Sequence, residues 1–443
     1  MNFAPSYRIA LLLMMLLGAR DLRAAENWPG FRGAGDSHAR AQNLPWSWES
    51  RGRGAGNWSI RLPGYGQSSP VVWNDRVFVT AVSGEEKENL HVLAVALADG
   101  KILWQRDFQG TQRIKDSDTV SRGAPTPVVD ADRLYAVFES GDVFALTHAG
   151  ELVWLRSFVK DYGEVQGPHG YASSSVLVND LCIVQVAHAG PSYVLALEKA
   201  TGMERWRTPH PSQTGWSTPG VLTRNGRAQI ILSTSGSVRA VNAETGREEW
   251  CFADLQGNST ASPTIAGNYV AIGASTERAV GRMREAAESD AGATAGSLVL
   301  RLGTEWSRPP SLQWRSAKIS TSYSSPLALD GLIYFVNKVG VVQCVEMATG
   351  KILWQHRLPS ETWASPIANN GHTTFFCKHG QVVTLKGGPE LVEVAESQVS
   401  TTEVVYGVAA VDSSWIVRTG RGLIRISNPT SPQAPKLAES TGQ

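Results

Sequence analysis

A glycine followed four residues later by a tryptophan recurs along this 443-residue chain, and it constrains the fold more than any other feature. A short segment of alternating apolar residues precedes the glycine, so the unit is predicted to be a strand, a tight turn and a second strand. Glycine supplies the positive φ that such turns need. Because side chains alternate along a strand, Ile102 and Trp104 are expected to share a face. We predict that these tryptophans are structural pegs, and the full set is Trp58, Trp104, Trp154, Trp206, Trp250, Trp314 and Trp354.

A second element lies between the pegs: a Ser-Pro or Thr-Pro step that leads into an apolar strand, a turn and another strand. Together with the two strands of the peg unit, each repeat then has four strands. The steps begin at Ser69, Thr126, Thr218, Ser262, Ser325 and Ser365, and Ser174 begins an equivalent strand without the proline. An eighth strand of this kind begins near residue 405.

The two ends of the repeat array complete each other. Residues 404–426 hold three strands and no fourth, whereas a strand beginning at Trp58 has no three before it. Pairing them would close a ring and leave no open edge between units. The predicted fold is all-β, an eight-bladed β-propeller of four-stranded antiparallel blades closed by an N-terminal strand. Seven blades are the alternative, because the last two repeats lack the full motif and Val392 stands at one peg position.

The N-terminus has the pattern of a signal peptide. Arg8 precedes an apolar run over 9–17, which is too short to span a bilayer, and small residues follow at Ala24 and Ala25. We predict a signal peptide over 1–24, an N-terminal extension over 25–57, the propeller over 58–427 and a flexible tail over 428–443. The protein is therefore expected to be exported, periplasmic or secreted, without a transmembrane anchor, and monomeric. The charged, alanine-rich insertion 275–295 is expected to be a surface helix or a loop.

Charge and cysteine content narrow the classes of partner. Removing residues 1–24 takes away three arginines and one aspartate from a chain of net charge +1, so the mature chain is nearly neutral. A neutral chain offers no electrostatic attraction to nucleic acid, and we expect none as a partner. The four cysteines are far apart in sequence and are expected to be buried free thiols; they are Cys182, Cys251, Cys344 and Cys377.

The repeats resemble a known family. Ser68–Val72, Asp75–Val79 and Leu93–Trp104, with the opening Asn27–Gly33, are similar to the pyrroloquinoline quinone (PQQ) enzyme repeat, in the branch of eight-bladed propellers that includes BamB-like outer-membrane assembly lipoproteins. The resemblance implies the propeller fold over nearly all of 27–426, but it leaves the function open, since one fold hosts several functions. No cysteine lies near the predicted cleavage site, which departs from the lipoprotein pattern.

The resemblance also supplies a test for catalysis. Quinoprotein alcohol dehydrogenases of this family hold PQQ between a tryptophan and a disulfide of two adjacent cysteines, with Ca²⁺ beside it, and here no two cysteines are adjacent. Asp116 and Asp118 have Asp-x-Asp spacing, yet nothing nearby completes a calcium site. We therefore assign no catalytic residue, no metal and no cofactor, with PQQ and Ca²⁺ as the alternative.

Aromatic residues just before the inner strands form the candidate binding site. The inner strands line the central channel, so residues that precede them are expected to surround one of its mouths and to stack on a flat ligand or grip a peptide. The alternative is that they pack blade against blade. The candidates are His169, Tyr171, Trp216, Tyr323, Trp363 and Tyr406.

These observations favour a non-catalytic scaffold that binds unknown protein partners through the channel mouth or the blade edges, by analogy in envelope assembly. A PQQ-dependent or other quinoprotein-type oxidoreductase is the first alternative. A carbohydrate-binding propeller, which would use the same aromatic residues, is the second.

Overall fold

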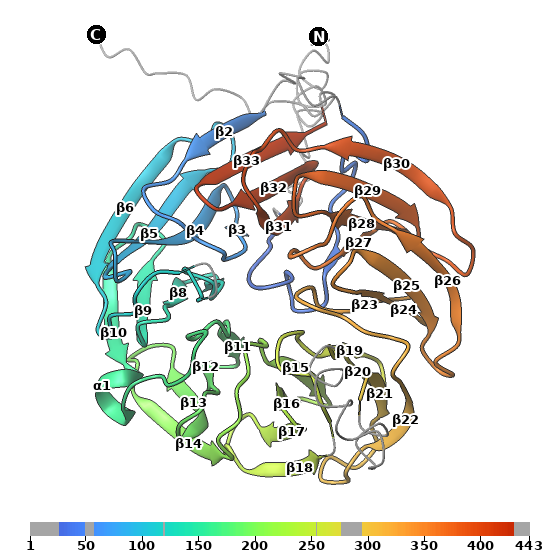
Figure 1. Cartoon of the computed structure of the whole chain (residues 1–443). Coiled ribbons are helices and arrows are strands. Elements are labelled where there is room, and N and C mark those ends of the chain that lie inside the picture. The colour runs from blue at the N-terminus through green and yellow to red at the C-terminus, as the bar shows by residue number, and fades with distance from the viewer. Residues whose placement is uncertain (1–25, 49–56, 118–119, 254, 276–294, 429–443) are drawn as a thin grey trace, which may run out of the picture.

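The computed structural model describes residues 26–48, 57–117, 120–253, 255–275 and 295–428, which form a ring of eight β-sheets (Figure 1). The signal peptide predicted over 1–24, nearly all of the insertion and the tail after Asn428 lie outside these residues. Among the described residues, no helix is long and apolar enough to cross a membrane. The eight-bladed architecture predicted from the repeats is confirmed.

Each blade is an antiparallel meander that runs from an inner strand at the channel to an outer strand at the rim. In that order, blade 1 consists of β3 (Val71–Trp73), β4 (Arg76–Ser83), β5 (Asn89–Ala96) and β6 (Ile102–Gln109), and blade 2 of β7 (Val128–Val129), β8 (Arg133–Val137), β9 (Asp142–Thr147) and β10 (Leu152–Ser157). Blade 3 consists of β11 (Val176–Val178), β12 (Leu181–Val186), β13 (Ser192–Glu198) and β14 (Glu204–His210), and blade 4 of β15 (Gly220–Arg224), β16 (Arg227–Thr234), β17 (Ser237–Asn242) and β18 (Glu248–Phe252). Blade 5 consists of β19 (Thr264–Ala266), β20 (Tyr269–Ile272), β21 (Ser297–Arg301) and β22 (Ser311–Ser316), and blade 6 of β23 (Leu327–Leu329), β24 (Leu332–Val336), β25 (Val341–Glu346) and β26 (Ile352–Arg357). Blade 7 consists of β27 (Ile367–Asn369), β28 (His372–Phe376), β29 (Gln381–Lys386) and β30 (Glu393–Gln398), and blade 8 of β31 (Val405–Val411), β32 (Ser414–Thr419), β33 (Gly422–Ser427) and β2 (Trp58–Arg61). A short helix, α1 (Phe158–Tyr162), follows β10.

The N-terminal strand closes the ring as predicted. β2 pairs antiparallel with β33, with Trp58 opposite Arg425 and Arg61 opposite Gly422. A second N-terminal strand, β1 (His38–Ala39), adds in parallel to the inner strand of blade 7, which makes that sheet five-stranded. The start of the chain therefore binds both of the last two blades.

Residues 26–48, which we call the N-terminal segment, cross the middle of the ring (Figure 1). Trp28 forms a β-bridge with Val72 of blade 1. On the far side, the Arg32 guanidinium donates to the carbonyl of Pro326 at 2.8 Å and to Thr264 Oγ1 at 3.0 Å. Arg32 is only 4% exposed, and burial lowers its pKa to about 10. The segment thus connects the inner strands of opposite blades through the centre.

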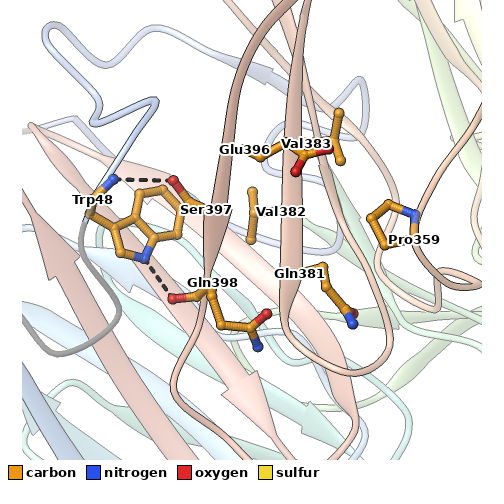
Figure 2. A pocket seen from close by; sticks show the side chains of 8 residues that line it. All are labelled: Trp48, Pro359, Gln381, Val382, Val383, Glu396, Ser397 and Gln398. Carbon is orange, nitrogen blue, oxygen red and sulfur yellow. Dashed lines mark hydrogen bonds between the residues drawn. The ribbon is translucent and has the colours of Figure 1, made fainter.

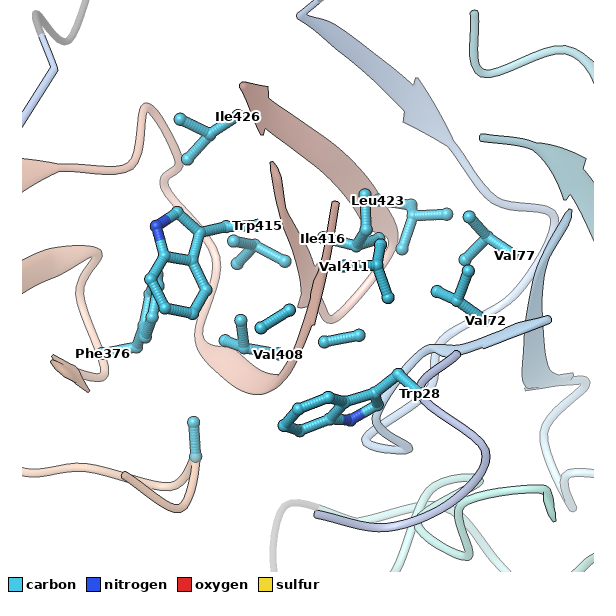
Figure 3. Close-up of a cluster of buried hydrophobic side chains, with 14 of the residues drawn as sticks. Trp28, Val72, Val77, Phe376, Val408, Val411, Trp415, Ile416, Leu423 and Ile426 are labelled. Atoms are coloured by element: carbon cyan, nitrogen blue, oxygen red, sulfur yellow. The ribbon is translucent and has the colours of Figure 1, made fainter. Parts of the chain in front are cut away.

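The core at the ring closure contains side chains from both ends of the chain (Figure 3). Trp28 packs with residues of β31 and β32, and the Trp415 ring lies edge-on to Phe376 with centroids 5.3 Å apart. The Trp415 indole donates to the carbonyl of Pro45 at 2.7 Å. Since apolar burial is the main stabilising contribution in folding, this shared core reinforces the pairing of β2 with β33.

The peg tryptophans pack against the next blade. Trp104 of blade 1 lies over Gly150 of blade 2 and donates its indole N–H to the carbonyl of His148 at 2.8 Å. Equivalent packing on a turn glycine is made by Trp58 on Gly100, Trp154 on Gly202, Trp206 on Gly246 and Trp314 on Gly350. The pegs therefore pack one blade against the next.

One expectation about the pegs was wrong. A β-bulge lies after the turn, so that Ile102 is opposite Val95 while Trp104 is opposite Ala94, and adjacent partner residues face opposite sides. Ile102 and Trp104 therefore point to different faces, and Ile102 is exposed. All four cysteines are free thiols in this structure, with Cys251 partly exposed and the others buried.

Candidate functional site

Four aromatic rings from successive blade junctions form a continuous series at one mouth of the channel. We call this set the aromatic face: Tyr323, Trp363, Tyr406 and Tyr65. Tyr323 stacks on Trp363 with centroids 3.9 Å apart and planes 4° apart. Trp363 meets Tyr406 edge-on at 5.5 Å, and Tyr406 meets Tyr65 edge-on at 6.0 Å. The mouth that carries these rings is the one formed by loops leading into the inner strands.

Polar contacts fix the Tyr65 end of the aromatic face. The hydroxyl groups of Tyr65 and Tyr406 share a hydrogen bond of 2.6 Å. The Arg122 guanidinium lies 5.1 Å from the centre of the Tyr65 ring, within reach of a cation–π interaction. Arg122 Nε in turn donates to Asp116 at 2.6 Å. Burial raises the pKa of Tyr65, and the hydrogen bond to Tyr406 raises it further. The Tyr65 hydroxyl is therefore protonated at neutral pH.

A buried arginine lies beneath the Tyr65 loop. Arg418 on β32 is completely buried and donates to the carbonyls of Gly66 at 3.2 Å and Thr80 at 3.3 Å. A Cβ at Gly66 would lie 2.3 Å from Arg418 Nη2, so only glycine lets the loop approach this closely. Burial lowers the pKa of Arg418 to about 9. The loop that carries Tyr65 is therefore held from below by blade 8.

A second aromatic pair lies on the opposite side of the mouth. His169 and Trp216 meet edge-on with centroids 5.6 Å apart, and the Trp216 indole donates to the carbonyl of Gly170 at 2.9 Å. Tyr171 does not join either group. Its ring is 2% exposed and packs edge-on against Phe158 in the core between blades 2 and 3, so the side chain is structural.

The long loop after β6 is held by a buried ion pair that the sequence patterns did not indicate. Lys87 Nζ and Glu139 Oε1 are 3.7 Å apart, and both side chains are 2% exposed. Lys87 also donates to the carbonyl of Ser121 at 2.5 Å, and Gly123 N donates to Glu139 Oε1 at 2.7 Å. Burial lowers the pKa of Lys87 and raises that of Glu139. The pair positions the end of the loop that carries Arg122.

Asp116 and Asp118 were considered as metal ligands because of their Asp-x-Asp spacing. Asp116 is bonded to Arg122, and Asp118 lies outside the described residues. In the described part of the chain, no three His, Cys, Asp or Glu side chains lie close enough together to hold a metal ion. The geometry of the described residues therefore identifies an aromatic surface.

A hollow of about 360 Å³ lies away from the mouth, on the outer part of blade 7 (Figure 2). Its lining residues are Trp48, Pro359, Gln381, Val382, Val383, Glu396, Ser397 and Gln398. Trp48 forms its wall because the indole donates to the carbonyl of Gln398 at 2.9 Å and the backbone N–H donates to Ser397 Oγ at 3.1 Å. These bonds hold the end of the N-terminal segment against the outer edge of β30.

The ring of eight four-stranded blades, its closure by β2 and the aromatic mouth define a β-propeller of the repeat type predicted from the sequence. The chain belongs to the family of PQQ-like repeat propellers whose model is described as outer membrane protein assembly factor BamB, which matches residues 50–190, 150–294 and 305–411. No match was found among curated proteins.

Solved structures share the fold at low sequence identity. BamB from Moraxella catarrhalis is 14% identical with a TM-score of 0.59, over 85% of this chain and 98% of that one. A europium-containing methanol dehydrogenase is 12% identical with a TM-score of 0.62, over 90% of both chains. The quinohemoprotein alcohol dehydrogenase from Comamonas testosteroni is 12% identical with a TM-score of 0.60, over 91% and 81%. At these identities the comparison establishes the fold alone.

Proposed function

We propose that the protein is an exported, non-catalytic scaffold that binds a segment of another protein across the aromatic face. The observation that carries this proposal is the unbroken contact from Tyr323 through Trp363 and Tyr406 to Tyr65. Aromatic side chains with a polar tip supply much of the binding energy at protein interfaces, because they bury a large area at a small cost in conformational entropy. A row of four such side chains suits an extended segment.

The packing of the rings supports a protein ligand over a flat cofactor. Tyr323 already covers one face of the Trp363 ring at stacking distance, so a planar ligand would have to displace it. The N-terminal segment also passes through the middle of the ring, with Arg32 bonded to the inner strands of blades 5 and 6. A planar cofactor would therefore have to compete with side chains that are already packed at the mouth and the centre.

Site-specific photo-crosslinking tests the proposal. Tyr323, which is 39% exposed, is replaced by the photoreactive residue p-benzoylphenylalanine, and the matched control carries it at Val339, an exposed residue of a loop at the same mouth. A discrete crosslinked protein is expected from position 323 and not from 339, and the Trp363→Ala change should reduce its yield. Equal crosslinking from both positions, or none, would contradict a partner on the aromatic face.

Export is part of the same proposal. It is supported by the apolar run over 9–17 and by a family description that refers to outer-membrane assembly. Cell fractionation with N-terminal sequencing should recover the chain outside the cytoplasm, beginning after residue 24. Recovery of the uncleaved chain in the cytoplasm would contradict this part and would leave the surface chemistry of the mouth unaffected.

A quinoprotein-type oxidoreductase is the second candidate. The observation that favours it is the Trp363 indole N–H, which is buried and has no hydrogen-bond partner among the described residues, next to the aromatic rings of the mouth. Calorimetric titration with PQQ in the presence of Ca²⁺ separates the two functions. Micromolar or tighter binding that is lost in Trp363→Ala would support the oxidoreductase, and no heat from folded protein would count against it.

A further inference from the structure

The outer strand of blade 2 has an apolar edge. In β10, Leu152, Val153 and Leu155 are 49%, 39% and 47% exposed. Within the described part of the chain β10 pairs only with β9, so the main-chain groups along its other side have no partner strand. An exposed apolar edge of this kind is a template for pairing with another strand, and natural propellers usually protect such edges.

Two of the other outer strands, β14 and β30, carry that protection, whereas β6 begins with the same kind of exposed apolar pair but is flanked by two positive charges, Lys101 and Arg106. β14 contains Glu204 and Arg205, both exposed, at the position where β10 has leucine and valine. β30 has one exposed valine, Val394, but Glu393 and Glu396 lie on either side of it, and the Trp48 indole donates to the carbonyl of Gln398 at the end of the strand. Charges on an edge strand discourage pairing with a second strand. The edge of β10 lacks such charges between Glu151 and Arg156.

The apolar surface continues onto the neighbouring blades. Ile102 and Leu103 at the start of β6 are 40% and 43% exposed, and Met203 in the next turn is 61% exposed. The blades are in direct contact here, because Arg106 donates to the carbonyl of Gly150 at 2.7 Å. Exposed apolar residues therefore occur beside the same turn, between the third and fourth strands, in three neighbouring blades.

We propose that this edge pairs with the same edge of a second copy of the chain, so that two β10 strands join antiparallel about a two-fold axis between Val153 and Trp154. This register places Glu151 opposite Arg156 and Leu152 opposite Leu155 of the other copy. The segment from Glu151 to Arg156 is therefore complementary to itself in charge and in apolar character. Such self-complementarity is the requirement for a two-fold symmetric interface.

The surroundings of β10 are compatible with this pairing. Arg156 uses three of its five N–H groups, two toward Asp161 and one toward the carbonyl of Gly202, so two remain for a carboxylate of the second copy. Helix α1, which follows β10, is held against blade 3, since Tyr162 donates to Glu204 and packs against Tyr193 with ring centroids 5.2 Å apart. The edge of the strand stays uncovered.

Sedimentation velocity of the purified full chain tests the proposal. A monomer–dimer equilibrium is expected over concentrations from about 1 to 100 µM, the range of a small, transient interface. Leu155→Lys should raise the dimer dissociation constant by about tenfold or more, because it puts a charge on the apolar edge. The matched control, Leu312→Lys, changes an equally exposed leucine on the outer strand of blade 5 and should leave the constant unchanged. A monomer at every concentration, or equal effects of the two variants, would overturn the proposal.

A charge exchange tests the register itself. Glu151→Arg alone and Arg156→Glu alone each place like charges opposite one another and should weaken the homodimer. Mixing the two variants restores an opposite pair at both positions, so a heterodimer is expected where neither variant forms a homodimer. Thermal melting shows whether Arg156→Glu, which loses its bond to Asp161, stays folded. A mixture of folded variants that remains monomeric would rule out this register. The proposal departs from the monomer predicted from sequence and does not depend on the aromatic face.

Discussion

The indole of Trp58 lies directly over Gly100, and this contact joins the closing strand to the first blade. A Cβ at Gly100 would lie 2.7 Å from Trp58 Cδ2, and the Trp58 indole N–H donates to the carbonyl of Leu97 at 2.9 Å. The glycine therefore serves two purposes: its φ of 76° forms the turn, and its lack of a side chain admits the ring from the neighbouring blade. Closure of the ring depends on this contact as well as on the pairing of β2 with β33.

Gly100→Ala should destabilise the protein more than the same change at a turn without a peg. The control is Gly226→Ala, because Gly226 has a similar φ of 74° and a Cβ there would meet no other atom within 4 Å. Both changes strain the backbone, but only the first also forces the Trp58 ring to move, which adds about 1–3 kcal/mol. Urea unfolding followed by tryptophan fluorescence measures the difference. Equal losses at the two sites would contradict the peg contact.

Trp154→Ala should lower the free energy of unfolding by about 3–5 kcal/mol, since it leaves a cavity between blades 2 and 3 and removes one of the two hydrogen bonds to the Lys199 carbonyl, the other coming from Arg133. Val339→Ala is the control, because this exposed side chain contributes little to stability. Chemical unfolding of the two variants gives the comparison. A loss below about 1 kcal/mol for Trp154→Ala would show that the indole does not bridge the blades.

Arg32→Met tests whether the N-terminal segment stabilises the ring through its centre. The change keeps the apolar part of the side chain but removes the N–H groups that donate to Pro326 and Thr264. Each of these hydrogen bonds that is lost without a water taking the place of the guanidinium should lower the free energy of unfolding by about 1.5–3 kcal/mol. The control is Arg40→Met, in an exposed residue of the same segment. Unfolding midpoints that shift equally in both variants would contradict a role for the central guanidinium.

Glu26→Gln should change how stability depends on pH. Burial, together with the nearby Asp412 carboxylate, raises the pKa of Glu26 from 4.5 to about 7. The folded state then binds more protons than the unfolded state between these values, so Glu26 makes stability fall as pH rises from about 4.5 to 7. The glutamine variant should lose less stability over this interval than the parent, and Glu244→Gln, in an exposed turn, should behave as the parent does. Urea unfolding at about pH 5 and about pH 7.5, on either side of most of this titration, provides the measurement.

The structure places Ala395, and not Val392, at the peg position of blade 7, because Ala395 lies opposite Thr384 after a bulge as Trp104 lies opposite Ala94. The absence of a tryptophan there has a structural explanation. A peg rests on the turn between the third and fourth strands of the next blade, as Trp58 does on Gly100. In blade 8 the fourth strand comes from the N-terminus, so blade 7 has no such turn in front of it. Val392, where the sequence pattern placed the peg, lies just before β30 and is 41% exposed. The missing tryptophan in the seventh repeat, which left a seven-bladed ring as an alternative, is therefore a consequence of the way the N-terminal strand closes an eight-bladed ring.

The candidate site was predictable only in part. Trp216, Tyr323 and Trp363 were identified because they share a position relative to the inner strands, and that position is a property of the repeat. Tyr406 was included because it lies near the start of the last inner strand. Tyr65 and Arg122 were missed, because neither lies in a repeated pattern and they meet only when blade 1, which separates them in the chain, has folded. Tyr171 was included by proximity in sequence, yet a turn at Gly170, where φ is 67°, precedes it and its ring lies in the core.

The number of blades, their four strands and the strand that closes the ring could all be predicted from the amino-acid sequence, since they follow from short-range spacing of glycine, proline and tryptophan that repeats along the chain. Three features became apparent only in the folded molecule: the faces that the pegs occupy, the hydrogen bonds of Arg32 to blades 5 and 6, and the pairing of Lys87 with Glu139 across a blade boundary. These features join residues far apart in the chain. They depend on burial and on a β-bulge that shifts the alternation by one residue, and a local pattern contains neither.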